Sequence, residues 1–113
     1  MSTIEAPAGL QLRSLVKANG ELELSLVEIA TPRPQADEVV IRVEASPINP
    51  SDIGLLLASA DMMSATQSGS SASPVIKARI PATAMKSMER RLDQSMPVGN
   101  EGAGIVVSAG SSN

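Results

Sequence analysis

Two runs of alternating leucines on either side of an Asn-Gly pair constrain the fold of this chain more than any other feature. Residues 10–17 place Leu10, Leu12 and Val16 on one side, and residues 21–30 alternate leucine with Glu or Ser. Asn19-Gly20 stands between the two runs. Such a pair favours a type I′ hairpin turn because both residues tolerate a positive φ. The sequence therefore predicts an antiparallel pair of strands over 10–17 and 21–30.

Three further segments have the pattern of strands. Residues 39–45 read V-V-I-R-V-E-A, so one face carries only apolar side chains and is expected to belong to the core. Shorter strands are predicted over 74–80 and 102–109. With these segments the chain is mainly β. The four residues of the expected core face are Val39, Ile41, Val43 and Ala45.

Two short helices are predicted between the strands. Asn49-Pro-Ser-Asp52 has an N-cap residue, a proline at the first helical position and an acid in the first turn. A helix is therefore expected over about 50–59, with Ile53, Leu56 and Leu57 buried. A second helix is expected over 84–94, where apolar residues recur at spacings of three and four. Residues 58–74 are rich in Ser, Ala and Gly and are predicted to be a mobile loop. The apolar stripe of the second helix consists of Met85, Met88, Leu92 and Met96.

Several classes of protein are excluded by what the chain lacks. It has no Phe, Tyr or Trp, so its core must be built from aliphatic residues and six Met. It has no Cys or His, which excludes disulfides, thiol nucleophiles, imidazole bases and the usual zinc sites. Nine scattered basic residues against twelve acidic ones give no footprint for nucleic acid. No apolar run is long enough for a membrane span, and the N-terminus lacks a signal-peptide pattern. A cytoplasmic location is expected.

A glycine-dense segment, P-V-G-N-E-G-A-G-I-V-V, occupies residues 97–107 near the end of the chain. Its order, Gly99-x-x-Gly102-x-Gly104, is not the G-x-G-x-x-G of dinucleotide-binding turns. These glycines also precede a predicted strand rather than a helix, so they cannot direct a helix N-terminus toward a pyrophosphate. A phosphate-binding loop is therefore rejected.

Three segments in order resemble the amino-terminal, GroES-like domain of the medium-chain dehydrogenase/reductase superfamily. They are the acidic pair and strand of residues 37–45, the cluster S-P-I-N-P-S-D of residues 46–52, and the Gly-x-Glu-x-x-Gly-like segment of residues 98–104. The zinc-independent NADPH:quinone oxidoreductase branch is the most similar. The resemblance covers about residues 10–110 and implies an α+β fold, a partial GroES-like β-barrel.

The resemblance also assigns roles to individual residues. Asn49 stands where zinc-dependent members have a cysteine ligand, and Asn100 stands where they have a histidine. Amides are poor zinc ligands, so no zinc is expected. On this resemblance Asn49, Pro50 and Asp52 border the nicotinamide, Asn100 faces the substrate cleft and Glu101 lies just behind it. Structural alternatives stay open: Asn49 as a helix cap only, Asp52 as a dipole complement, Asn100 as a turn residue and Glu101 as a surface acid.

The resemblance implies that the complete protein transfers a hydride from NADP(H) to a quinone or enone and is a homodimer. The Rossmann domain that holds most of the cofactor, and the segment that completes the barrel, are expected beyond residue 113. The chain would then be an amino-terminal fragment, inactive by itself. About forty residues between the first helix and Gly99 exceed the usual family connection. The alternative is a stand-alone GroES-like barrel that acts as a binding or assembly module.

Overall fold

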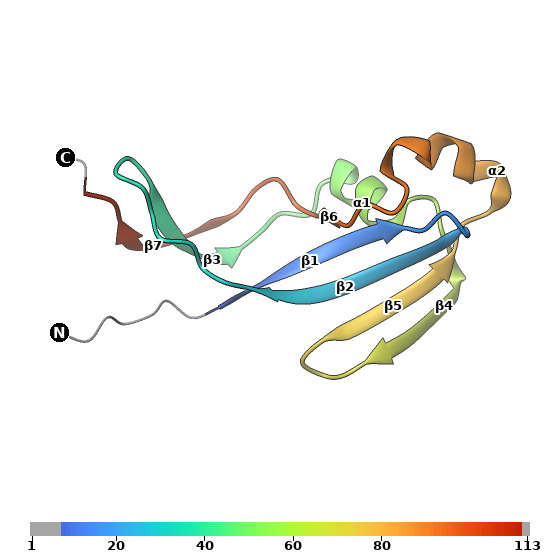
Figure 1. The fold of residues 1–113 in the computed structure, drawn as a ribbon, viewed down its shortest axis with the longest axis horizontal. Helices are drawn as coiled ribbons and strands as arrows, with labels where there is room; N and C mark the ends of the chain where they lie inside the picture. Colours follow the sequence, from blue (N-terminus) through green and yellow to red (C-terminus); the bar gives the residue numbers. More distant parts are fainter. Residues whose placement is uncertain (1–7, 112–113) are drawn as a thin grey trace.

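The computed structural model describes residues 8–111, nearly half of which form antiparallel β-sheet (Figure 1). The predicted class, mainly β with a few short helices, is confirmed. The strands are β1 (Gly9–Val16), β2 (Glu21–Ile29), β3 (Val39–Ala45), β4 (Asp61–Gly69), β5 (Pro74–Arg79), β6 (Met96–Pro97) and β7 (Ala103–Ala109). The helices are α1 (Pro50–Leu57), α2 (Ala82–Met85) and the 3-10 helix η1 (Lys86–Arg91).

The strands form two separate sheets. A five-stranded main sheet has the order β4-β5-β2-β1-β6, and β3 pairs only with β7 in a two-stranded ribbon. In Figure 1 the ribbon projects from one end of the molecule, away from the helices. Within residues 8–111 the two sheets do not close into a barrel.

The predicted hairpin of β1 and β2 is confirmed, with Val16 opposite Leu22. Its turn differs from the type I′ prediction, because only Gly20 has a positive φ, of 88°. The Gly20 N–H donates to the Lys17 carbonyl at 3.0 Å, which closes a four-residue turn over residues 17–20. This turn needs a left-handed backbone at Gly20 only, whereas a type I′ turn would also need one at Asn19. The Asn19 side chain instead accepts a hydrogen bond from the Glu21 N–H at 3.0 Å.

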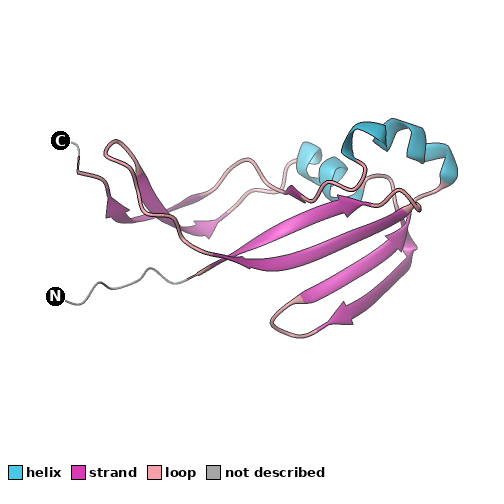
Figure 2. Ribbon diagram, viewed as in Figure 1, coloured by secondary structure: helices cyan, strands magenta, loops and turns pink. Residues whose placement is uncertain are grey.

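The core lies where the helices cover one face of the main sheet (Figure 2). Val16 and Leu22 are completely buried there. Three residues of the predicted apolar stripe, Met85, Met88 and Leu92, pack against this core, whereas Met96 belongs to β6. The partly buried contacts from α1 are Leu56 and Leu57.

The single helix predicted over 84–94 is wrong, because α2 ends at Met85 and η1 follows directly. The Ser87 hydroxyl donates to the Ala84 carbonyl at 2.8 Å, a local bond that competes with the α-helical ladder. The three-residue repeat of a 3-10 helix still keeps Met85 and Met88 on one side. The stripe was therefore informative about packing but not about helix type.

The loop predicted over 58–74 is also wrong, because residues 61–69 form β4 at the edge of the main sheet. Nearly all of its residues are exposed, so the strand depends on backbone pairing with β5 and shows no apolar alternation. The ladder is interrupted between Asp61 and Thr66. Ser64 closes this gap: its hydroxyl accepts from the Arg79 N–H at 2.8 Å and donates to the Asp61 carbonyl at 2.6 Å.

The face of β3 that was expected to be core is exposed. Val39, Ile41 and Val43 keep 52%, 49% and 59% of their surface accessible, and Ala45 is exposed as well. The reason is topological: β3 has the alternation of a half-buried strand, but no helix or second sheet of the described residues packs on the ribbon. Ile53 in α1, also expected to be buried, is 46% exposed.

Candidate functional site

The residues singled out from the sequence lie together at the junction between the ribbon and the rest of the molecule. Two connectors meet there, residues 46–49 between β3 and α1 and residues 98–102 between β6 and β7. Figure 1 shows the two connectors running between the ribbon and the region of α1 and β6. We call this junction the neck.

Asn49 begins α1 with its backbone and reaches the second connector with its side chain. Its carbonyl accepts from the Asp52 N–H at 2.9 Å, and its own N–H donates to Asp52 Oδ2 at 2.9 Å. Its side-chain Nδ2 donates to Glu101 Oε2 at 2.8 Å. Because a carboxylate only accepts, this bond fixes which way the amide points. Asn49 is thus more than a helix cap.

Asp52 joins the same two connectors from inside the protein. It is 7% exposed, and its second carboxylate oxygen accepts from Asn100 Nδ2 at 3.3 Å. Pro50 is exposed at the first position of α1, where its missing N–H has no cost. Two amide–carboxylate pairs, Asn49 with Glu101 and Asn100 with Asp52, therefore hold the neck together.

A hollow of about 380 Å³ lies beside these pairs; the carboxylates Asp52 and Glu101 line it, whereas Asn49, Pro50 and Asn100 do not. Its volume is at the small end of ligand pockets and suits one ring rather than a whole dinucleotide. The Val98 N–H donates to the Leu12 carbonyl at 3.0 Å, which holds the second connector against β1. The lining residues are Leu12, Ser46, Pro47, Ile48, Asp52, Ile53, Leu56, Val98, Gly99 and Glu101.

Some lining residues were not recognisable from the sequence. Leu12 and Leu56 look like ordinary core residues, and nothing local shows that they end beside Val98. Ser46, Pro47 and Ile48 belong to the cluster that was singled out, but the sequence gives no reason to place them at a cavity wall. A second hollow of about 400 Å³, lined by Lys77 and Arg79 among others, contains none of the predicted residues.

The charged residues that line the hollow are all acidic. Asp52 and Glu101 line it, and no Lys or Arg does. Within residues 8–111 neither carboxylate has a cationic side chain within 4.0 Å. An anionic ligand would meet like charge in a partly enclosed space, so the hollow disfavours anionic ligands. No side chain in the lining is suited to hold the phosphates of a dinucleotide.

The opposite end of α1 is fixed by a second polar cluster. Arg91 Nη1 donates to the Leu55 carbonyl at 2.8 Å, and Arg91 Nη2 donates to Ser14 Oγ at 2.9 Å. The Ser14 hydroxyl, completely buried, donates to the Leu56 carbonyl at 2.9 Å. Burial lowers the pKa of Arg91. These bonds satisfy carbonyls that a helix C-terminus leaves without partners, so α1 is held at both ends.

No protein-family model and no curated protein matches the chain. In the part of the chain that the structure describes, no group of three Asp, Glu, His or Cys side chains is placed to hold a metal ion. None of the helices between residues 8 and 111 has the length and apolar character needed to span a membrane.

Proposed function

We propose that this chain forms the substrate-side wall of a zinc-independent, NAD(P)H-dependent oxidoreductase that reduces quinones or enones. The observation that carries the proposal is the hydrogen bond from Asn49 to Glu101, residues 52 positions apart, beside an apolar hollow sized for one ring. Those residues come from two of the three segments that resemble the medium-chain reductases. On this proposal the β-sheets are an incomplete GroES-like barrel, and the protein works in the cytoplasm.

Asn49 and Asn100 do not line the hollow themselves, so on this proposal the two amides would bind a carbonyl oxygen from its rim. Each uses one N–H on a carboxylate, and a side-chain amide has a second N–H to offer. Oriented donors of this kind stabilise negative charge that develops on an oxygen as a carbonyl is reduced. Bound NADPH would supply the hydride. The aliphatic part of the lining would exclude water from the ring of the substrate.

The donor set does not suit zinc, because Asn49 and Asn100 are amides and the chain has no Cys or His. It suits a nicotinamide ring better, since an amide and an apolar wall can orient such a ring. The dinucleotide phosphates need other groups, because no cation lines the hollow. We therefore assign most of the cofactor to a separate Rossmann domain and expect no NADPH oxidation by the 113-residue chain alone. Turnover with a quinone would contradict this division.

Binding of a substrate fragment tests the proposal without the cofactor. The chain is labelled with ¹⁵N and titrated with 2-cyclohexen-1-one, and the side-chain amide signals of Asn49 and Asn100 are followed by NMR. We expect these signals and the backbone signals of Val98 and Gly99 to shift. Asn100→Ala should weaken binding about tenfold, as expected for the loss of one charge-polarised hydrogen bond.

The matched control is Asn19→Ala, which removes an amide from the hairpin turn and should leave binding unchanged. A carboxylated analogue, 3-oxocyclohex-1-ene-1-carboxylate, should bind more weakly than the neutral enone because two carboxylates face the hollow. Absence of shifts at saturating enone, or equal binding by Asn100→Ala, would refute the proposal.

One observation favours a second candidate, a binding or assembly module. The ribbon exposes aliphatic side chains on β3 and β7, which is typical of a surface that another protein covers. On this alternative the hollow would bind no enone, and the ribbon would be the functional surface. The titration above therefore separates the two candidates.

A further inference from the structure

The ribbon is an unfinished sheet. It contains only β3 and β7, so within residues 8–111 each strand has one edge that no other strand pairs with. Almost all of its residues are exposed. A two-stranded sheet is only marginally stable alone, and an unpaired edge readily accepts another strand. The ribbon therefore needs a further strand more than the main sheet does.

We propose that β3 pairs antiparallel with β3 of a second copy of the chain, about a two-fold axis at Val43. This pairing places Arg42 of each copy opposite Glu44 of the other, so the charges of the strand are self-complementary. Opposite charges directly across an antiparallel pair are stabilising. The product is a four-stranded sheet in which the two β3 strands are central and the two β7 strands are outermost. The proposal does not depend on the proposed function, although a strand that completed a barrel at this edge would compete with the pairing.

Other registers of the same pairing are disfavoured. An axis at Arg42 would set the two arginines against each other, and an axis at Glu44 would oppose the two glutamates. An axis between two residues would place the apolar side chains of one copy on the charged face of the other. Only the axis at Val43 keeps both the charges and the faces matched. The register of β3 against β7 shifts between Val43 and Ala45, but the contact between Arg42 and Glu44 shows that these two side chains stay on one face of the strand. Ile41 and Val43, both about half exposed, then share one face with the same residues of the second copy.

Arg42 and Glu44 can replace the ion pair within their own strand by ion pairs with the second copy. Arg42 and Glu44 are 61% and 50% exposed and form an ion pair within their own strand, with Nη2 and Oε1 2.9 Å apart. An exposed pair of this kind contributes little to the fold. The outer edge of β7 offers no comparable register, because the strand A-G-I-V-V-S-A has no charged residue. Charge complementarity thus selects β3 rather than β7.

Charge reversal tests the pairing in sedimentation equilibrium over a range of protein concentrations. We expect the native chain to dimerise. Arg42→Glu and Glu44→Arg each place like charges opposite one another twice, and each should weaken dimerisation about tenfold or more. The double variant Arg42→Glu/Glu44→Arg restores opposite pairs and should recover the native dimer. A monomeric native chain, unaffected single variants or an unrecovered double variant would each overturn the proposal.

A cross-link locates the axis, because the chain has no native cysteine. Two cysteines at Val43→Cys would meet across the axis at a Cα separation suited to a disulfide. The matched control is Val106→Cys, which is exposed to 55% against 59% for Val43 but lies on the outer strand. We expect a disulfide-linked dimer from Val43→Cys only. Equal cross-linking at both positions would indicate stacking of the faces instead and would contradict edge pairing.

Discussion

Asn49 shows how one residue can serve a helix and a site at once. Its backbone makes the bonds that begin α1, and this leaves its side chain for Glu101. A serine or aspartate would begin the helix equally well, but neither offers an amide N–H to a carboxylate. The choice of asparagine is therefore explained by the bond across the neck rather than by the helix.

Asn49→Asp tests this explanation because it preserves the cap and places a carboxylate against Glu101. At pH 7 we expect the free energy of unfolding, measured in urea, to fall by about 1 kcal/mol. In the double variant Asn49→Asp/Glu101→Gln the amide and the carboxylate change places, and the loss should be recovered. Native stability of Asn49→Asp, or no recovery in the double variant, would show that the bond contributes nothing.

A second residue-scale prediction concerns Glu21 and Lys17 near the hairpin turn. The hydrogen bond from Lys17, 2.9 Å long, lowers the pKa of Glu21 below its ordinary value of 4.5 and raises the pKa of Lys17 above 10.5. The lowered pKa means that the pair stabilises the folded chain above about pH 4.5, and that this contribution is lost as the pH falls through the folded pKa. The raised pKa of Lys17 means a loss as the pH rises through its folded value.

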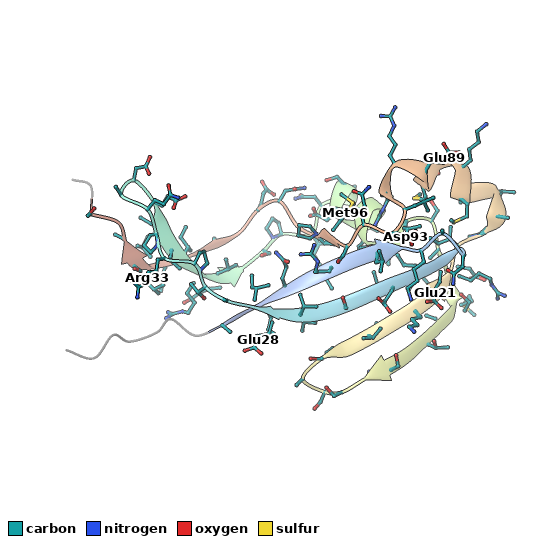
Figure 3. All side chains as sticks on the ribbon, viewed as in Figure 1. Glu21, Glu28, Arg33, Glu89, Asp93 and Met96 are labelled. Atoms are coloured by element: carbon teal, nitrogen blue, oxygen red, sulfur yellow. The ribbon has the colours of Figure 1, made fainter. Side chains whose placement is uncertain are left out.

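Unfolding in urea at a series of pH values measures this effect. Glu21→Gln should flatten the acid side of the stability profile. Glu28→Gln is the control, since Glu28 is exposed on the same strand and forms no ion pair within the described residues (Figure 3). If both variants changed the acid side equally, the Lys17 bond would not be its cause.

At the scale of elements, α1 is the piece that connects the site to the core. It has only eight residues, too few for an isolated helix to persist in water. Its start is held by Asp52, and its last carbonyls are held by Arg91 and Ser14. The position of Asn49 therefore depends on bonds made at the far end of the helix, about 12 Å away.

Ser14→Ala should destabilise the chain although it removes a single oxygen. It leaves the Leu56 carbonyl and one donor of Arg91 without their partner, and a buried polar group without a partner costs about 1–3 kcal/mol. Ser25→Ala on β2 is the control, because Ser25 is also partly buried and makes no side-chain hydrogen bond that the described structure shows. Urea unfolding that gives equal losses for both variants would contradict the role of Ser14.

The sequence was a good guide to elements whose patterns are local. The alternation around Asn19-Gly20 and the signals at Asn49-Pro50 predicted β1, β2 and α1 within two residues. The structure brings Asn49 into hydrogen-bond contact with Glu101, and Asp52 with Asn100, while their functional roles stay proposals. β4 was missed because an exposed edge strand needs no apolar face. The exposure of Val43 was missed because alternation indicates an apolar face but not what covers it.

At the scale of the whole molecule, the chain is elongated. Its principal extents are 55 × 28 × 23 Å and its radius of gyration is 17.2 Å, against about 13 Å for a compact domain of this length. The buried core lies entirely beneath the helices, and the ribbon contributes no residue to it. The two parts should therefore differ in stability.

Gly104→Ala tests this difference. A Cβ at Gly104 would overlap the Arg42 carbonyl oxygen, so the ribbon must open or distort. We expect amide hydrogen exchange to lose its protection in β3 and β7 while β1 and β2 keep theirs. Gly54→Ala is the control, because nothing lies within 4 Å of its Cβ, and it should leave both parts intact. Loss of protection throughout the chain would mean that the parts fold as one unit.

The position of the hollow at the neck has a consequence for the direction of the ribbon. Its walls come from both connectors and from β1 and α1. A molecule bound there would therefore contact the base of the ribbon as well as the main sheet and α1. A ligand in the hollow would hold the two connectors of the neck in place. It would thereby narrow the range of directions in which the ribbon can point. Binding of a small molecule at the neck would thereby change how freely the distal end of the ribbon moves relative to the main sheet.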